Sequence, residues 1–311
     1  MVVPLACGAM MTTFAPHTAD FFGSFTGALF TGAIPILAVF YVCLGSTIPL
    51  RTLPEMLKRG GVLMATKVGV GIALGLVLGR LIGILPVQGG WLAGISTLAV
   101  VAAFVNTNGG LYIALMERYG RPADAGAYCV LSLESGPFFT MVAMGVAGLS
   151  SFPWQTLVGA ILPLFLGLVL GNLDPEIRDL LGKAAPALIP FFAFALGASM
   201  NLARVRDAGL AGLVLGIAVI AISGAFLFVA DRLTGGTGIA GLAAATTAGN
   251  AAAVPALVAA ADPKFAQAAG PATVLVASSV LVTAFLVPPL VAWFDNRTRS
   301  TAASTEERGA S

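Results

Sequence analysis

The stretch Asn106-Thr107-Asn108-Gly109-Gly110 interrupts Trp91–Met116, an apolar segment that otherwise has the character of one membrane-spanning helix. Asparagine, threonine and glycine are poor helix formers, and lipid does not tolerate backbone polar groups without partners. The stretch therefore predicts a helix break that is buried inside protein, beside a polar cavity. A helix restarting there would point free N–H groups and its positive dipole end at that cavity, which suits an anionic ligand. The alternative is a tight glycine-mediated helix crossing without a ligand.

A second interrupted segment lies at the matching place in the other half of the chain. Thr246-Thr247-Ala248-Gly249-Asn250, with Pro255 beyond it, interrupts Gly238–Ala261. Paired interrupted helices at corresponding positions of two halves are the best sequence indication of a transport site. We therefore predict that groups from both breaks bind a substrate: Thr107, Asn108, Gly109, Gly110, Thr247 and Asn250.

The composition places this pair of breaks in a membrane protein. The chain has 311 residues, of which 58% are apolar and 10% charged, and its mean hydropathy is +0.96. Soluble domains carry about 25% charged residues, and disorder requires low hydrophobicity, so both classes are excluded. A net charge of +2 with scattered Lys and Arg residues gives no basic face for nucleic acid. The class that remains is an all-α polytopic membrane protein.

Apolar stretches divide the chain into ten predicted spans. They are Val2–Phe14, Phe25–Ile48, Gly61–Ile84, Trp91–Met116, Ala123–Leu149, Trp154–Leu170, Pro186–Leu202, Ala208–Val229, Gly238–Ala261 and Ala268–Phe294. Residues 295–311 have no apolar period and are predicted to form a disordered cytoplasmic tail. Lys and Arg residues outside the spans concentrate on the side of the N-terminus, which predicts that both termini are cytoplasmic.

Weak internal matches indicate that the spans form two repeats, residues 1–150 (spans 1–5) and 151–294 (spans 6–10). Pro4-Leu5 and Gly8 recur as Pro163-Leu164 and Gly167 at one constant offset. Gly94-Ile95, Leu98-Ala99 and Asn106 recur in the same way as Gly238-Ile239, Leu242-Ala243 and Asn250. A repeat with an odd number of spans enters the membrane from opposite sides in its two copies. The sequence thus predicts two inverted five-helix repeats, whose broken helices, spans 4 and 9, cross.

Two charged residues lie deep inside spans. Glu134 is the carboxylate in Ala123–Leu149, and an ionisable group at that depth is a functional candidate by default. We predict that Glu134 carries a coupled cation, with oxygen donors from Asn106, Ser132 and Ser135. The alternative is a buried ion pair with Lys67, the cation deep in Gly61–Ile84. Lys67 could instead bind a substrate carboxylate, and the residues alone leave both roles open.

Motifs for enzymes are not found in the sequence. It contains no HExxH, GxSxG or P-loop pattern. The prediction is a non-enzyme without a cofactor or a certain metal site, whose transport is not driven by its own ATP hydrolysis.

Several stretches together resemble the bacterial 2-keto-3-deoxygluconate permease family. They are FGSFTGALFTGAIPILAVFYVCLG (Phe22–Gly45), GISTLAVVAAFVNTNGGLY (Gly94–Tyr112), SLESGP (Ser132–Pro137), GNLDPE (Gly171–Glu176) and IPFFAFALG (Ile189–Gly197). The resemblance covers nearly the whole chain. The family is in turn similar, distantly, to bile acid–sodium symporters, which implies a panel domain of spans 1, 2, 6 and 7 and a core domain of spans 3–5 and 8–10.

The resemblance implies uptake of 2-keto-3-deoxygluconate, an anionic sugar acid, with H⁺ across the bacterial inner membrane by alternating access. Two alternatives remain: a Na⁺-coupled symporter of a related carboxylate, since an Asn/Ser/Glu cluster serves Na⁺ as readily as H⁺, and a membrane sensor that binds the solute without moving it. The expected partners are the substrate and the lipid bilayer, and the sequence does not indicate an oligomeric state.

Overall fold

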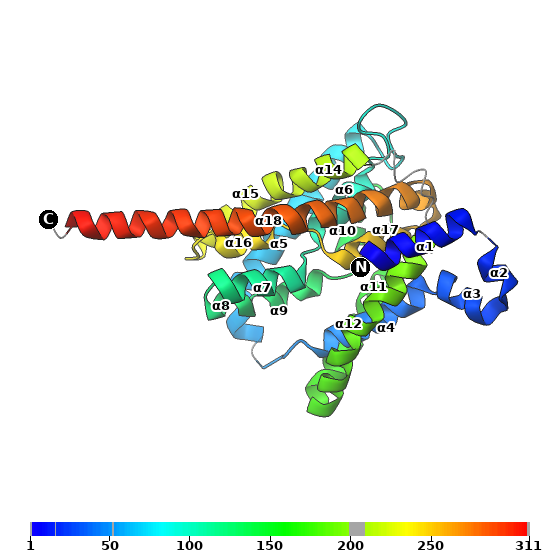
Figure 1. Ribbon diagram of the computed structural model, residues 1–311, viewed down its shortest axis with the longest axis horizontal. Helices are drawn as coiled ribbons and strands as arrows, with labels where there is room; N and C mark the ends of the chain where they lie inside the picture. The colour runs from blue at the N-terminus through cyan, green and yellow to red at the C-terminus, as the bar shows by residue number, and fades with distance from the viewer. Residues whose placement is uncertain (1, 16, 52, 199–208, 310–311) are drawn as a thin grey trace.

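The computed structural model describes residues 2–15, 17–51, 53–198 and 209–309, and every regular element in these ranges is helical (Figure 1). The α-helices are α1 (Val2–Phe14), α2 (Thr18–Phe21), α3 (Gly23–Thr31), α4 (Ala33–Ser46), α5 (Leu53–Leu81), α6 (Thr97–Val105), α7 (Gly109–Tyr119), α8 (Pro122–Gly126), α9 (Tyr128–Leu131), α10 (Phe138–Val146), α11 (Trp154–Leu173), α12 (Pro175–Ala198), α14 (Gly209–Ala218), α15 (Gly224–Leu233), α16 (Ile239–Ala244), α17 (Val254–Ala261) and α18 (Ala266–Gly309). Short 3₁₀ turns are η1 (Ser132–Glu134), η3 (Gly249–Ala253) and η4 (Pro263–Phe265), and η2 (Val219–Ser223) is a π-helical turn. The predicted all-α class is confirmed.

Within the described part of the chain, six segments are long and apolar enough to cross a membrane. They are Leu57–Leu81, Thr97–Tyr119, Trp154–Leu173, Leu210–Leu233, Ile239–Ala261 and Pro263–Thr298. The number becomes eight if two bent helix pairs, Gly23–Thr31 with Ala33–Ser46 and Asp124–Glu134 with Phe138–Val146, each count as one span. These eight correspond to eight of the ten predicted spans.

The two bent pairs correct spans that we predicted as continuous helices. The axis turns by 60° between α3 and α4 and by 66° between the segment Asp124–Glu134 and α10. Pro35 stands in the first turn of α4, where it has no N–H to continue a helix from α3. At the second bend Gly136 adopts φ +104°, a left-handed conformation that favours glycine, and Pro137 follows it.

The two predicted spans outside this set correspond to α1 and α12. α1 has 13 residues, about 20 Å at 1.5 Å per residue, whereas the hydrocarbon core is about 30 Å thick. α12 begins earlier than predicted, at Pro175, and its first half carries charged side chains, among them Lys183. The count of ten spans stays a prediction. Pro16, the predicted boundaries at Leu202 and Ala208, and residues 310–311 lie outside the described residues.

The C-terminal end of the last helix also differs from the expectation. α18 does not stop at Phe294 but continues as one helix to Gly309, through most of the segment predicted to be disordered. Residues 290–308 contain neither glycine nor proline, the two strongest helix breakers, so local sequence does not end the helix at the predicted boundary.

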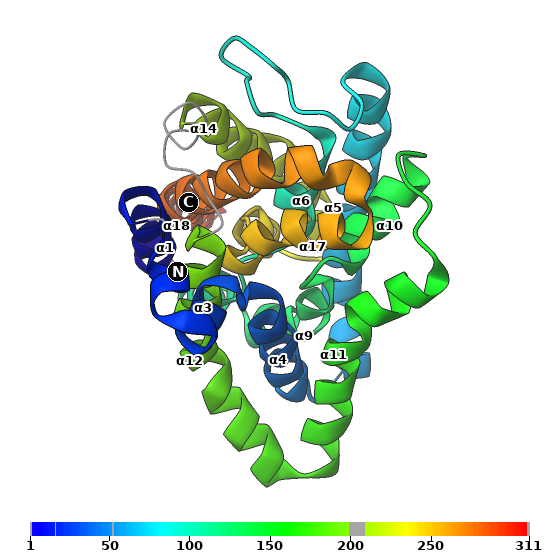
Figure 2. The ribbon, with the colours of Figure 1, turned by 90° about the vertical axis from the view of Figure 1, so that its right-hand side faces the viewer.

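Helix contacts divide the described chain into two groups. In the first, α4 packs against α11 and α12, and α12 packs against α1. In the second, α18 packs against α14, α6 and α17, and α5 packs against α6. Figure 2 shows α11 and α12 meeting at the bottom of the view, below the cluster that contains α6, α17 and α18. The α4–α11 contact is backbone against backbone: a Cβ atom at Gly167 would overlap the carbonyl of Val42. Small residues allow such approaches between membrane helices.

Candidate functional site

The first predicted break lies between α6 and α7. α6 ends at Val105, and Asn106 and Asn108 have extended backbone conformations. The Asn108 side chain then caps the restarted helix by accepting a hydrogen bond of 3.2 Å from the Leu111 N–H. The non-helical residues are therefore 106–108, and Gly109 and Gly110 form the first turn of α7 instead of belonging to the break. First-turn amides have no partner within a helix, so α7 presents polar N–H groups at this depth.

The second predicted break lies between α16 and α17. α16 ends at Ala244, residues 245–248 are not helical, and the chain restarts through η3 into α17. Thr246 and Thr247 are fully buried. The Ala248 position before η3 carries no side-chain cap. Both predicted interruptions are thus present, each within a segment of 23 residues that is apolar enough to span a membrane.

The two breaks are in direct contact, although they are about 140 residues apart in sequence. The Ala248 N–H donates to the Asn106 carbonyl at 3.0 Å. The Asn108 N–H donates to the Thr246 hydroxyl at 3.0 Å, and the Thr247 hydroxyl donates to the Ala103 carbonyl at 3.1 Å. Some of the backbone groups that each break releases are therefore satisfied by the other break, as burial requires.

Glu134 lies at the first break. It ends η1, its side chain is 1% exposed, and its Oε1 accepts a hydrogen bond from the Thr107 N–H. Its Oε2 has no hydrogen-bond partner in the described part of the protein, and neither have the Asn106 Oδ1 and Thr107 Oγ1. A buried carboxylate oxygen without a donor is costly. It indicates a place where a proton, a cation or water completes the structure.

The second break has a contact that corresponds to the hydrogen bond between Thr107 and Glu134, but its side-chain acceptor is uncharged. The Thr247 N–H donates to the Thr283 hydroxyl of α18 at 3.1 Å, and the Thr247 and Ser279 hydroxyls are 2.8 Å apart. In both halves, then, a threonine amide of the break binds a side-chain oxygen of the following span. Thr283 and Ser279 were missed by the sequence analysis because hydroxyl groups in apolar helices are common and carry no spacing signal.

Lys67 on α5 is fully buried, but it is not within ion-pair distance of Glu134. Its Nζ donates to the Ala244 carbonyl at 2.6 Å and to the Thr246 carbonyl at 2.7 Å. Among the ion pairs of the described residues, none joins Lys67 to Glu134 within 4.0 Å. The alternative of a direct Lys67–Glu134 pair is therefore wrong, since the ammonium is held by carbonyls at the end of α16.

Three residues at or next to the breaks are accessible to solvent. Gly110 is exposed, and Asn108 and Asn250 are half-buried. Asn250 Nδ2 lies 3.5 Å from the hydroxyl of Tyr41, which reaches it from α4. Tyr41 thus links the first group of helices to the second break. We did not single it out from the sequence, because one tyrosine in an apolar span resembles an interfacial residue.

The two predicted serine donors differ in position. Ser132 is buried and donates its hydroxyl hydrogen to the Cys129 carbonyl at 2.9 Å, which leaves its oxygen lone pairs for other partners. Ser135 is half-buried and follows Glu134 directly at the bend. Both remain within one or two residues of the carboxylate, as the sequence requires.

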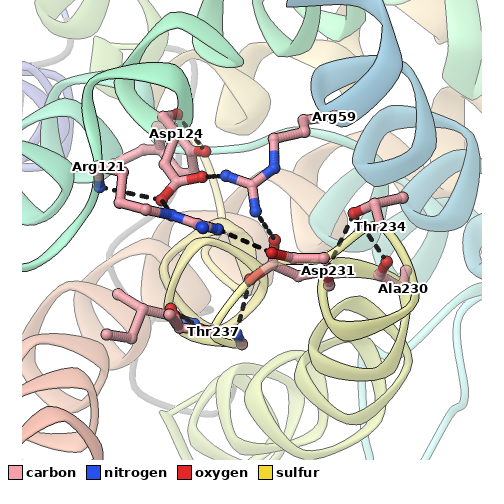
Figure 3. A network of polar contacts seen from close by, with 11 residues as sticks. Arg59, Arg121, Asp124, Ala230, Asp231, Thr234 and Thr237 are labelled. Atoms are coloured by element: carbon pink, nitrogen blue, oxygen red, sulfur yellow. Dashed lines mark hydrogen bonds and ion pairs between the residues drawn. The ribbon is translucent and has the colours of Figure 1, made fainter.

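A separate ion-pair network joins the ends of the two broken spans. Figure 3 shows Arg59 of α5 between Asp124 and Asp231, both 2% exposed. Arg59 pairs with Asp124 and lies 3.8 Å from Asp231. The hydroxyl of Tyr112, in the first turn of α7, donates to the Asp124 carbonyl at 2.8 Å. The Asp231 carboxylate accepts a hydrogen bond of 2.8 Å from the N–H of Gly238, the residue just before α16.

Replacement of Asp231 with alanine should lower the thermal unfolding temperature by several degrees. Removing one partner of a buried pair costs about 3–5 kcal/mol because the other charge stays buried; we expect about 3 kcal/mol, since Arg59 keeps Asp124. Thermal unfolding of the purified protein measures the effect. Asp179→Ala is the matched control: Asp179 pairs with Lys183, but the two side chains are 65% and 75% exposed, so little change is expected. Equal shifts in the two variants would contradict a stabilising role for the network.

Comparisons with known proteins agree on one family. The profile of a family described as 2-keto-3-deoxygluconate permease matches residues 1–300. A 2-keto-3-deoxygluconate permease of Bacillus subtilis (strain 168) is 47% identical over 298 residues, covering 96% of this chain and 90% of that protein. One of Escherichia coli O7:K1 is 46% identical over 310 residues, covering 99% of this chain and 95% of the relative. These are names of transporters, not of enzymes.

Proposed function

Because the chain belongs to the 2-keto-3-deoxygluconate permease family, we propose that it is a secondary symporter that takes up 2-keto-3-deoxygluconate together with H⁺. It is a multi-pass membrane protein, and in this proposal it works in the bacterial inner membrane with both termini cytoplasmic. The observation that carries the proposal is the contact between two buried helix breaks, with the carboxylate of Glu134 at one of them. Such a pair of breaks is where secondary transporters bind substrate and coupling ion.

The substrate would bind on the accessible side of the breaks. The first-turn amides of α7, at Gly109 and Gly110, and the positive end of the helix dipole suit its carboxylate. Side chains of Asn108 and Asn250 are half-buried and offer donors and acceptors for its hydroxyl groups. Thr107 and Thr247 are buried at the two breaks and would line the inner part of the site.

Glu134 would carry the coupling proton. A proton on Oε2 would turn an unpartnered acceptor into a donor, which the unpaired Asn106 and Thr107 oxygens could accept. Ser132 and Ser135 would complete this cluster. The same oxygens suit Na⁺, so Na⁺ coupling to a related carboxylate is the second candidate.

Alternating access would move the core helices against the panel helices. The grouping of contacts supports this division, because α4, α11 and α12 pack together and α18 packs against α6, α14 and α17. The ten spans and the inverted repeat belong to the same proposal. The matching contacts of Thr107 with Glu134 and of Thr247 with Thr283 support the repeat.

Uptake of labelled 2-keto-3-deoxygluconate into proteoliposomes tests the proposal, with pH and Na⁺ gradients imposed separately. We expect accumulation with an inward proton gradient and no further gain from Na⁺ over choline. Accumulation that follows the Na⁺ gradient alone would establish the second candidate. Equilibration without accumulation would make the protein a facilitator. Binding without uptake would contradict transport and favour a sensor.

A further inference from the structure

Lys67 is the most deeply buried cation of the described chain. Its side chain is 0% exposed, and none of the other described Lys and Arg residues is buried. Burial of an ammonium group is unfavourable unless charges or hydrogen bonds compensate for the lost water. Lys67 therefore occupies a place that binds positive charge strongly.

The partners of Lys67 show what this place is. The Ala244 and Thr246 carbonyls lie at the C-terminal end of the half-helix α16 and in the break that follows it, 2.6 and 2.7 Å from Nζ. The last carbonyls of a helix have no partner within the helix, and the dipole adds about half a negative charge there. In transporters with broken helices, unwound carbonyls and half-helix C-terminal ends are the groups that coordinate the coupling cation.

We propose that the Lys67 ammonium is a built-in cation. It occupies a carbonyl site at the second break, and a free alkali cation would otherwise fill that site. The site therefore needs no Na⁺. In this proposal Lys67 positions the broken span, and it does not contact the substrate carboxylate as the sequence analysis predicted. One part of this inference rests on the proposed function, namely that a proton on Glu134 is the coupling ion.

The charges around Lys67 fit this role. None of the ion pairs of the described residues includes Lys67, so its ammonium contacts the two carbonyls and not a carboxylate. Because both carbonyls come from the second break and Glu134 binds the first, each charge lies at one of the two breaks. The ammonium thus compensates the carbonyl end of α16 without neutralising Glu134 by direct contact.

Removal of the ammonium should create a site for a free cation. We would replace Lys67 with alanine and follow thermal unfolding without substrate, in Na⁺, methylammonium or choline chloride of equal ionic strength. The wild type should unfold at the same temperature in all three salts. Lys67→Ala should unfold earlier in choline and regain several degrees in Na⁺ or methylammonium, because these ions are small enough to reach the two carbonyls.

Two variants separate a cation site from simple loss of packing. Lys67→Met fills the same space without charge, so we expect destabilisation that no salt reverses. Lys58→Ala removes an exposed lysine of the same helix and should behave as the wild type. If Lys67→Ala does not yield folded protein, Lys67→Gln keeps one donor for the carbonyls, and Na⁺ should stabilise it over choline.

The inference is overturned if Lys67→Ala, or Lys67→Gln in its place, unfolds at the same temperature in all three salts. It is equally overturned if the wild type or Lys67→Met gains as much from Na⁺ as Lys67→Ala does. Failure of the proposed function is a different result: wild-type protein that neither binds nor takes up labelled 2-keto-3-deoxygluconate would refute that function and leave these salt effects unchanged.

Discussion

Replacement of Glu134 with glutamine is expected to abolish concentrative uptake while the protein stays folded. Glutamine keeps the size of the side chain and an oxygen that can accept the Thr107 N–H, but it cannot exchange a proton. Symport requires that proton and substrate favour each other's binding, and a side chain that never titrates removes this coupling free energy. The ratio of internal to external substrate should therefore fall to about 1 under a pH gradient imposed without a membrane potential.

The measurement is accumulation of labelled substrate in proteoliposomes, alongside exchange of substrate between equal concentrations on the two sides. Exchange should persist in Glu134→Gln, because a permanently neutral side chain still allows substrate to bind. Glu117→Gln is the matched control: Glu117 is exposed on α7, and its neutralisation should leave accumulation intact. Normal gradient dependence in Glu134→Gln would show that another group couples the proton.

Replacement of Gly109 with alanine should have the second large effect. Gly109 is the first residue of α7 and is buried, and a Cβ atom there would overlap the hydroxyl and ring of Tyr128. Overpacking of this kind typically costs about 1–3 kcal/mol, and we expect the upper end because the clash lies where the two breaks meet. Both the unfolding temperature and the uptake rate should fall, and thermal unfolding with transport assays measures them.

The neighbouring glycine gives the control. A Cβ at Gly110 would meet its nearest atom, Asn108 Oδ1, at 4.0 Å, so Gly110→Ala should leave the unfolding temperature unchanged. Because Gly110 is exposed beside the proposed substrate site, its alanine variant should instead weaken substrate binding. Tyr128→Leu combined with Gly109→Ala should regain part of the lost stability. Equal unfolding temperatures for Gly109→Ala and the wild type would contradict the packing described.

Local sequence predicted the two breaks because helix propensity is a local property. Asn106, Thr107 and Asn108 at the first break and Thr246 and Thr247 at the second are poor helix formers. Ala248 is a strong helix former, and its N–H instead donates to the Asn106 carbonyl across the breaks.

The bends of spans 2 and 5 also have glycine and proline residues, Gly32 with Pro35 and Gly136 with Pro137. Counting apolar residues alone does not detect them. Such residues do not bend a helix by themselves, because Pro163 and Pro190 lie inside the continuous helices α11 and α12.

The partners across the breaks could not be predicted in this way. Lys67 is recognisable as a buried cation, but its partners are backbone carbonyls, which every residue has and no residue type marks. The contact of Tyr41 with Asn250 depends on how two helix groups dock, and it joins residues 209 apart in sequence. Tertiary packing, not residue type, decides both contacts.

The separate positions of Lys67 and Glu134 have an electrical consequence. With Glu134 ionised, the two buried side chains carry opposite charges and the empty carrier is neutral at its centre. Binding of one proton and one singly charged sugar acid leaves that total unchanged. Each elementary charge moved through 100 mV of membrane potential is worth about 2.3 kcal/mol, so a carrier that is neutral in both directions exchanges no energy with the voltage. Under the proposed proton symport, a cell would then collect the sugar acid from its pH gradient even while its membrane is depolarised.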